Sequence, residues 1–360
     1  MRLLTRLALG LLACTCLLGG RVHAAADAPF TVEDLVRLKR ISNPQVSPDG
    51  RVLAFVQRET DMKANKGRTS LWLLDLADPA AVPQRATGVP ANDSSPRWAP
   101  DGHTLYFLSN RSGSSQVWRL NLPVLAAQRV TDYPLEVTSL KVSPRGDALA
   151  LSMEVFPDCE SLQCTRERLD QRAAEKSSGR VYDRVFIRHW DTWSDGTRSH
   201  LFTAAVGASG TAAAPVDVSK GFDADIPDKP FGDDKSYSYS PDGKRLVFSA
   251  RIAGRTEPWS TNFDLFETPA DASAAPVNLT ASNPAWDSQP RFLDNGDLVW
   301  LAQERPGFES DRFHIMLRDG RSGAVRSLTG GWDRSVAEVA PTRDGKSLVV
   351  TGLCRWRAGP

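Results

Sequence analysis

Aspartates recur at one position of a repeated motif and are the first candidates for chemistry in this 360-residue chain. Each precedes a glycine in a copy of Ser-Pro-Asp-Gly or a close variant of it: Asp49, Asp101, Asp242 and Asp344. An array of carboxylates can serve general acid–base catalysis or bind calcium. An aspartate before glycine in such a turn also accepts hydrogen bonds from its own backbone, and this role accounts for the whole pattern. We therefore assign the four aspartates to turns.

The segment 188–196, Arg-His-Trp-Asp-Thr-Trp-Ser-Asp-Gly, is the densest group of side chains that could bind a ligand. Its tryptophans could stack on a ligand, and its histidine and carboxylates could form hydrogen bonds with one. The candidate substrate-facing residues are His189, Trp190, Asp191 and Trp193. The competing interpretation, which we favour, is a strand whose tryptophan rings pack between neighbouring sheets and whose Asp-Gly pair makes the next turn.

The motifs of several enzyme classes are missing from the sequence. The nucleophile elbow Gly-x-Ser-x-Gly does not occur, and its nearest imitators, at 207–211 and 320–324, lack the last glycine. A zinc-binding His-Glu-x-x-His, a P-loop and a dinucleotide-binding Gly-x-Gly-x-x-Gly are also absent. The sequence therefore predicts no catalytic residue, no cofactor and no metal site. A site in the central channel of a repeat fold is kept as an alternative.

The balance of charge and the first residues of the chain bear on partners and location. Lys and Arg number 44 and Asp and Glu 43, whereas nucleic-acid-binding proteins carry a basic excess. Residues 1–24 combine Arg2 and Arg6 with a short apolar run and a Val-His-Ala site, which is the pattern of a secretory signal peptide. No later apolar run approaches the ~20 residues of a membrane span. We expect a periplasmic or secreted protein; a lipoprotein anchored at Cys14 is the weaker alternative.

Two of the three cysteines outside the signal segment, Cys159 and Cys164, lie close together in polar sequence. In an oxidising compartment such a pair can close a small loop as a disulfide, although free thiols remain the alternative. A lone pair is a poor zinc site because tetrahedral zinc needs four ligands. We predict the disulfide.

A repeated hairpin must position these candidates. Its turn glycines stand at 50, 102, 146, 243, 296 and 345, and each is followed by β-branched, aromatic or aliphatic residues that favour strands. A second marker, an apolar residue or alanine followed by Thr or Ser, recurs at 86–87, 130–131, 218–219, 279–280 and 328–329. Four short strands in about 45 residues are the signature of a propeller blade.

Counting the repeats predicts an all-β propeller with five full blades and the first two strands of a sixth. The 97 residues between Gly146 and Gly243 contain one end marker, so we interpret them as one blade with a charged insertion at about 156–188. The predicted organisation is a signal peptide (1–24), a lead-in with a short amphipathic helix at about 31–39 (25–43), an incomplete propeller (44–351) and an aberrant tail (352–360). We expect the segment 223–234 to be a solvated loop between blades.

Several segments resemble the prolyl-oligopeptidase family of serine peptidases, and most closely its dipeptidyl-peptidase V and acylaminoacyl-peptidase branch. They are the Phe-Thr-x-Glu-Asp-Leu opening at 30–35, the run at 40–50 and the His-Trp-Asp-Thr-Trp segment at 189–193. The cysteine pair and the Lys-Pro-Phe loop at 229–231 add to the likeness. The hairpin alone is less specific, because TolB-type propellers share it. The resemblance covers about residues 28–351.

The resemblance implies an N-terminal propeller that filters and orients peptides for a C-terminal α/β-hydrolase domain with Ser, Asp and His. The sequence ends before such a domain would begin, so no catalytic residue is carried over. We therefore expect a shortened, inactive chain. Its ring should be unclosed, with bare apolar residues at 348–350. The predicted partners are peptides or that hydrolase domain, with no nucleic acid. The alternative function is a stand-alone TolB-like propeller that binds a protein or a cell-wall component.

Overall fold

The computed structural model describes residues 29–88, 90–179, 181–182, 188–189, 191–342 and 344–353. The predicted signal peptide, Trp190 and the tail from 354 onward lie outside these residues. Within the described residues no helix is long and apolar enough to cross a membrane. Strand is the dominant regular secondary structure of the described chain, as the alternating and β-branched segments predict.

Five four-stranded antiparallel sheets and a final two-stranded sheet follow one another along the described chain, and a second two-stranded sheet lies within the third repeat. The first sheet contains β1 (Arg40–Val46), β2 (Val52–Asp61), β3 (Lys66–Asp75) and β4 (Gln84–Arg85). The second contains β5 (Asp93–Trp98), β6 (Thr104–Ser109), β7 (Gln116–Asn121) and β8 (Gln128–Arg129). The third contains β9 (Ser139–Val142), β10 (Ala148–Val155), β13 (Arg198–Ala205) and β14 (Val216–Asp217).

The remaining sheets follow the same order. The fourth contains β15 (Tyr237–Tyr239), β16 (Arg245–Ala250), β17 (Asp264–Pro269) and β18 (Val277–Asn278). The fifth contains β19 (Asp287–Phe292), β20 (Leu298–Ala302), β21 (His314–Arg318) and β22 (Val325–Ser327), and the sixth contains β23 (Ser335–Pro341) and β24 (Leu348–Leu353). These sheets are the five full blades and partial sixth blade of the predicted β-propeller.

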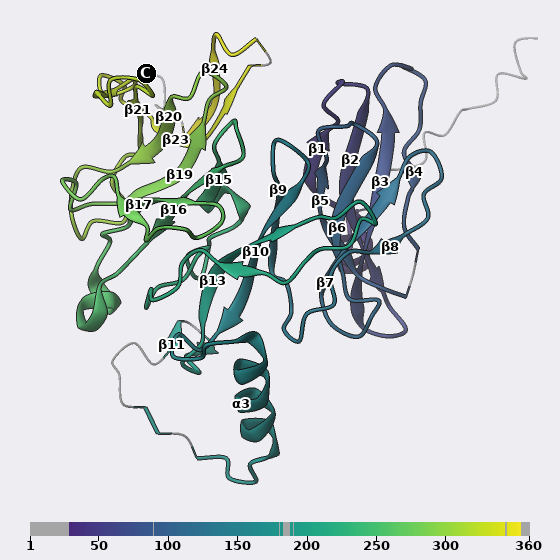
Figure 1. Ribbon diagram of the computed structural model, residues 1–360. Helices are drawn as coiled ribbons and strands as arrows, with labels where there is room; N and C mark the ends of the chain where they lie inside the picture. The colour runs from purple at the N-terminus through teal and green to yellow at the C-terminus, as the bar shows by residue number, and fades with distance from the viewer. Residues whose placement is uncertain are drawn as a thin grey trace, which may run out of the picture.

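The first strand of each blade lies toward the axis of the arrangement. Contacts join β1 to β5, β5 to β9 and β15 to β19, so first strands are neighbours at three of the blade boundaries, and β9 contacts η2 just before β15. Figure 1 shows the third blade between the two N-terminal blades and the blades that follow it. The short outermost strands, such as β4 and β8, lie at the rim.

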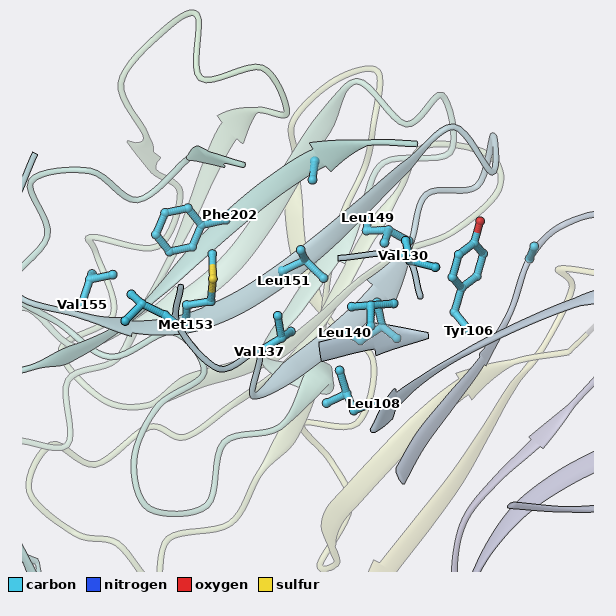
Figure 2. Packing of buried hydrophobic residues seen from close by; sticks show 14 residues of the cluster. Tyr106, Leu108, Val130, Val137, Leu140, Leu149, Leu151, Met153, Val155 and Phe202 are labelled. Atoms are coloured by element: carbon cyan, nitrogen blue, oxygen red, sulfur yellow. The ribbon is translucent and has the colours of Figure 1, made fainter. Parts of the chain in front are cut away.

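Apolar side chains from facing blades form a separate core at each boundary. Between the second and third blades, Tyr106 and Leu108 meet Leu140, Leu151 and other residues, as Figure 2 shows. Four further clusters occupy the boundaries between blades one and two, three and four, four and five, and five and six. Burying these faces is the main favourable contribution to folding.

The two sequence markers have the local roles that their chemistry predicts. The Asp49 carboxylate accepts hydrogen bonds from the Ser47 hydroxyl and the Arg51 amide, at 2.5 and 3.1 Å, and Asp242 does the same in its own turn. The hydroxyl of each end marker accepts a hydrogen bond from an amide of the third strand of its blade. These pairs are Thr87 with Leu71, Thr131 with Val117, Ser219 with Leu201, Thr280 with Leu265, and Thr329 with Ile315.

The insertion in the third blade contains a helix that the sequence analysis missed. It joins β10 to β13 and includes α3 (Leu162–Ala174) and a hairpin of β11 (Arg188–His189) and β12 (Thr192–Trp193). Figure 1 shows α3 beyond the edge of the sheets. Its apolar Leu162 and Leu169 pack against the cluster of Figure 2.

Three predictions are corrected. The lead-in helix α2 (Val32–Arg37) forms, but none of its residues is buried, and the first blade already begins at Arg40. In β24 Val349 is exposed, whereas Leu348 and Val350 pack against the cluster between blades five and six. The loop predicted to be solvated is partly core, because Ala224 and Ile226 are buried between the third and fourth blades. The remaining short elements are the 3-10 helices η2 (Asp234–Ser236) and η3 (Gly254–Trp259).

Candidate functional site

Two adjoining cavities lie where the insertion covers the boundary between the third and fourth blades. The larger has a volume of about 1120 Å³ and is lined by α3, the chain that follows it and η3. The smaller, of about 90 Å³, lies between the β11–β12 hairpin and the loop at 225–229. Both are lined by residues 194–195, Thr197, Arg198 and Glu257, so they form one continuous site.

Arg198, the first residue of β13, is the electrostatic centre of this site. Its guanidinium donates to Asp223 at 2.9 Å, to Asp225 at 3.0 Å and to both oxygens of Glu257 at 2.9 and 2.7 Å. Burial disfavours the charged guanidinium, but its bonds with Glu257 and its attraction to Asp225 outweigh burial and raise its pKa. Arg251 lies 3.8 Å from the same Glu257 carboxylate. The cluster thus joins β13, the loop that follows the third blade and η3.

Lys229 connects this cluster to the second strand of the third blade. Its ammonium lies 2.5 Å from Glu154 of β10 and 3.1 Å from Asp225. Burial lowers the pKa of Lys229, but the two carboxylates outweigh burial and the net effect raises its pKa. The side chain remains 45% exposed, so it can still contact a ligand in the cavity.

Two further carboxylates line the smaller cavity and differ in their surroundings. Burial raises the pKa of Asp228, whose Oδ1 accepts a hydrogen bond from the Ser236 hydroxyl at 2.9 Å. Burial also acts on Asp195, but bonds from the Thr197 hydroxyl and amide outweigh it and lower the pKa of Asp195. The cavity therefore contains one carboxylate that holds its proton more tightly than usual and one that loses it more easily.

The predicted substrate-facing residues are partly brought to this site. Trp193 lines the smaller cavity and is 50% exposed, so it does not pack between blades as the favoured interpretation predicted. Its ring lies 5.8 Å from the Tyr182 ring and 5.5 Å from the Arg188 guanidinium. His189 pairs with Thr192 through the backbone, and Asp191 is exposed in the turn between them. Trp190 and the side chain of His189 lie outside the described part of the chain.

Aromatic and ionic contacts fix the insertion at the mouth of the larger cavity. Arg168 and Arg172 of α3 stack on the Phe156 ring at 4.6 and 4.5 Å, and Arg168 also forms a two-point ion pair with Asp158. Cys159 and Cys164 are joined in a disulfide that links the preceding turn to the first turn of α3. The wall formed by α3 is thus held from its first turn to its last.

Sequence reasoning missed Arg198, Asp225 and Glu257, which are the best-connected charges of the site. Asp225 alternates with Ala224 and Ile226, and this period of two was a signal that one face of the segment is buried. Glu257 is separated from Arg198 by 59 residues, so no local pattern relates the two side chains. The site presents polar and charged groups beside an aromatic surface. Among the described residues, no group of His, Cys, Asp and Glu side chains could hold a metal ion.

The chain is similar to known propellers and peptidases. A family model described as a TolB β-propeller domain matches residues 36–181. Dipeptidyl-peptidase 5 of Porphyromonas gingivalis is 25% identical over 330 residues, which cover 89% of this chain and 45% of the relative. Dipeptidyl-peptidase 5 of Aspergillus fumigatus is 29% identical over 355 residues, with 91% and 48% covered. The chain spans about half the length of these curated relatives.

Solved structures show the same fold at lower sequence identity. Acylaminoacyl peptidase from Pyrococcus horikoshii superimposes with a TM-score of 0.63 at 15% identity, over 90% of this chain and 44% of that chain. The β-propeller domain of the trilobed protease from Pyrococcus furiosus gives a TM-score of 0.51 at 13% identity, over 90% and 82% of the two chains.

Proposed function

We propose that this chain admits and orients peptides for a serine peptidase. The chain is a TolB-like β-propeller related to the N-terminal part of dipeptidyl-peptidase 5. The peptidase would be of the prolyl-oligopeptidase family, and its partner would be an α/β-hydrolase domain that carries the catalytic serine. The observation that carries the proposal is the continuous cavity between the third and fourth blades, beside the half-exposed Trp193.

The lining of this cavity suits a peptide. A peptide presents amide groups, charged ends and side chains of mixed polarity, and such a ligand needs polar partners beside apolar surface. Lys229, Asp195 and Asp228 supply polar groups of both signs, while Trp193 and Phe263 supply aromatic surface. The ion pairs around Arg198 hold the walls in place before a ligand arrives, which lowers the entropic cost of binding.

We also infer that the protein works in the periplasm or outside the cell. The disulfide between Cys159 and Cys164 is of a kind that persists in oxidising compartments. The first 24 residues have the composition of a signal peptide. These two features support the same location independently.

A second candidate function is a propeller that binds a protein or cell-wall component without any hydrolase domain. The match of residues 36–181 to the TolB propeller description favours it. The two candidates differ in the ligand that the cavity should bind. A peptide ligand supports the first, and a cavity that binds no peptide favours the second.

The test compares binding of a fluorescein-labelled peptide to the wild-type chain, Trp193→Ala and Trp332→Ala. Trp332 is exposed to a similar degree, 46%, but lies after the outermost strand of the fifth blade and serves as the control. Loss of aromatic stacking worth about 1 kcal/mol should weaken binding about fivefold in Trp193→Ala and leave Trp332→Ala unchanged. Absence of binding to the wild-type chain, or equal affinities in all three, would overturn the proposal.

A further inference from the structure

Three blades place a cation at the same position of their first strands. Arg97 pairs with Tyr106, Lys141 with Ala150 and Arg291 with Val299, in each case one residue before the strand meets its turn. The same position is held by Gln45, Ser238 and Ala340 in the other blades. The first strands lie toward the axis of the propeller. Residues at the same position of these strands therefore lie at the same height along the axis, and so do the three cations.

These cations gather around Asp234 at the start of η2. Arg97 forms an ion pair with the Asp234 carboxylate, and the Lys141 ammonium lies 3.9 Å from it. Lys141 also donates to the backbone oxygens of Asp234 and Tyr237, both at 2.6 Å. The Asp234 carboxylate also attracts the Arg291 guanidinium electrostatically. This guanidinium donates no hydrogen bond to any described residue.

The cluster has donors that the protein does not satisfy. The Arg97 side chain is 9% exposed, and its buried Nε has no hydrogen-bond partner among the described residues. A buried guanidinium N–H without an acceptor is costly, and native proteins rarely leave one unless a ligand or water completes it. This orphaned donor is a sign that an acceptor is missing.

Carboxylates other than Asp234 act on the cluster from its edge. Asp233 lies 3.8 Å from the Lys235 ammonium, and Lys235 also pairs with Glu338 at 2.5 Å. Asp294 acts on Arg291 from the following turn. Among the described carboxylates, Asp234 is the one that forms ion pairs within the cluster, with Arg97 and Lys141.

We propose that Arg97, Lys141 and Arg291 form a carboxylate-binding site at the axis of the propeller. The proposal rests on the proposed function in one respect, since the ligand is a peptide carboxylate, either the C-terminal group or an acidic side chain. Guanidinium groups bind carboxylates through two parallel N–H donors, and an ammonium adds a compact charge. A peptide held at this level would be selected by the position of its negative charge.

Lys141 makes the site sensitive to alkaline pH. Burial lowers its pKa to about 8; Asp234 and Asp233 act against this effect, whereas Arg97 and Arg291 reinforce it. Tyr237, whose ring lies 5.1 Å from the ammonium, completes its surroundings. Binding of a carboxylate should therefore weaken as the pH rises above about 8.

The test follows the arginine Nε–H signals of the ¹⁵N-arginine-labelled chain by NMR while small carboxylates are added. Three probes are compared. N-acetylglycine carries a terminal carboxylate, the α-amide of N-acetylglutamic acid carries only the side-chain carboxylate, and N-acetylglycinamide is uncharged. The signals of Arg97 and Arg291 should shift with at least one carboxylate and not with the amide. The carboxylate that acts identifies the source of the charge.

Variants separate this site from a general attraction of anions. Arg291→Gln, at an exposed position that the fold tolerates, should weaken carboxylate binding about tenfold, because a hydrogen bond to a charged group is lost. Arg326→Gln, on the outermost strand of the same blade, should bind as the wild type does. No shift with either carboxylate, or equal binding by Arg291→Gln and wild type, would overturn the proposal.

The outcome does not depend on the cavity at Trp193. Trp193→Ala should respond to the carboxylates as the wild type does, since the two sites involve different residues. A carboxylate response without binding of the labelled peptide would refute the proposed function alone. Peptide binding without a carboxylate response would refute the axial site alone.

Discussion

Asp93 and Asp287 occupy the same position in the second and fifth blades, but only Asp93 has a cationic partner among the described residues. Each begins the first strand of its blade and pairs with the last residue of the second strand. Arg111 Nη2 donates to both oxygens of Asp93 at 2.9 Å. Asp287 instead accepts from the Trp300 indole at 2.7 Å and from the Asn283 amide at 3.1 Å.

This difference predicts that Asp287 makes the fold less stable at high pH. Burial raises the pKa of Asp287 from 3.8 to about 7, although bonds from Trp300 and Asn283 oppose it. The folded state therefore binds a proton that the unfolded state releases, and the free energy of unfolding falls between about pH 4 and pH 7 and is level above that range. Asp287→Asn should be more stable than wild type at pH 8, by roughly 1–3 kcal/mol, and nearly equal at pH 4.

Asp93→Asn is the matched control and should act in the opposite direction. It removes an ion pair from a buried carboxylate and leaves Arg111 without its partner. We expect a loss of about 1–3 kcal/mol near neutral pH. Urea unfolding of both variants at the two pH values measures these effects, and a destabilised Asp287→Asn at pH 8 would contradict the explanation.

Phe248→Ala should show how much the core between the third and fourth blades contributes. Phe248 is fully buried and its ring stacks on Phe266 at 5.8 Å. Removing the ring leaves a cavity, for which we expect a cost of about 3–5 kcal/mol. Val277→Ala, at a 61% exposed position in the outermost strand of the same blade, should change stability by less than about 0.5 kcal/mol. Thermal unfolding followed by circular dichroism compares the two.

The disulfide should stabilise the start of α3 rather than the propeller. Replacing both Cys159 and Cys164 by serine frees a short loop, and the chain-entropy model gives an effect of about 2 kcal/mol on that local structure. Hydrogen exchange over 162–174 should become faster, while exchange in β10 and β13 should not change. Mass spectrometry of unreduced peptides, from protein produced in an oxidising compartment, tests the bond itself, and two alkylatable thiols would refute it.

The chain should show no serine-peptidase activity and no labelling by a serine-directed phosphonate. Acyl transfer requires a serine activated by a neighbouring base. His200 instead contacts Asp217 at 2.8 Å and the Phe222 carbonyl at 2.9 Å, and His314 lies 3.1 Å from Glu304. Neither ring contacts a serine hydroxyl in the described structure. Stoichiometric labelling of any serine would show that a nucleophile has been missed.

The blades could be predicted from local sequence patterns. The Ser-Pro-Asp-Gly turn forms its hydrogen bonds within a few residues, as at Asp49, and the end markers such as Thr87 bind the strand of their own blade. These interactions are local and recur with each repeat, so their pattern is visible without any tertiary information. The helix α3 also left a signal, in Ser161 at its N-cap and in the spacing of Leu162 and Leu169, but the charged composition obscured it.

Only the tertiary structure decided what the blades bring together. Arg198 finds its partners Asp225 and Glu257 at distances of 27 and 59 residues along the chain, across the boundary between two blades. Arg97 and Lys141 meet at Asp234 because the first strands share one register around the axis, a relation that no local motif encodes. Charges far apart in sequence come into contact only after the apolar faces of neighbouring blades have packed, since that packing fixes the spacing between strands.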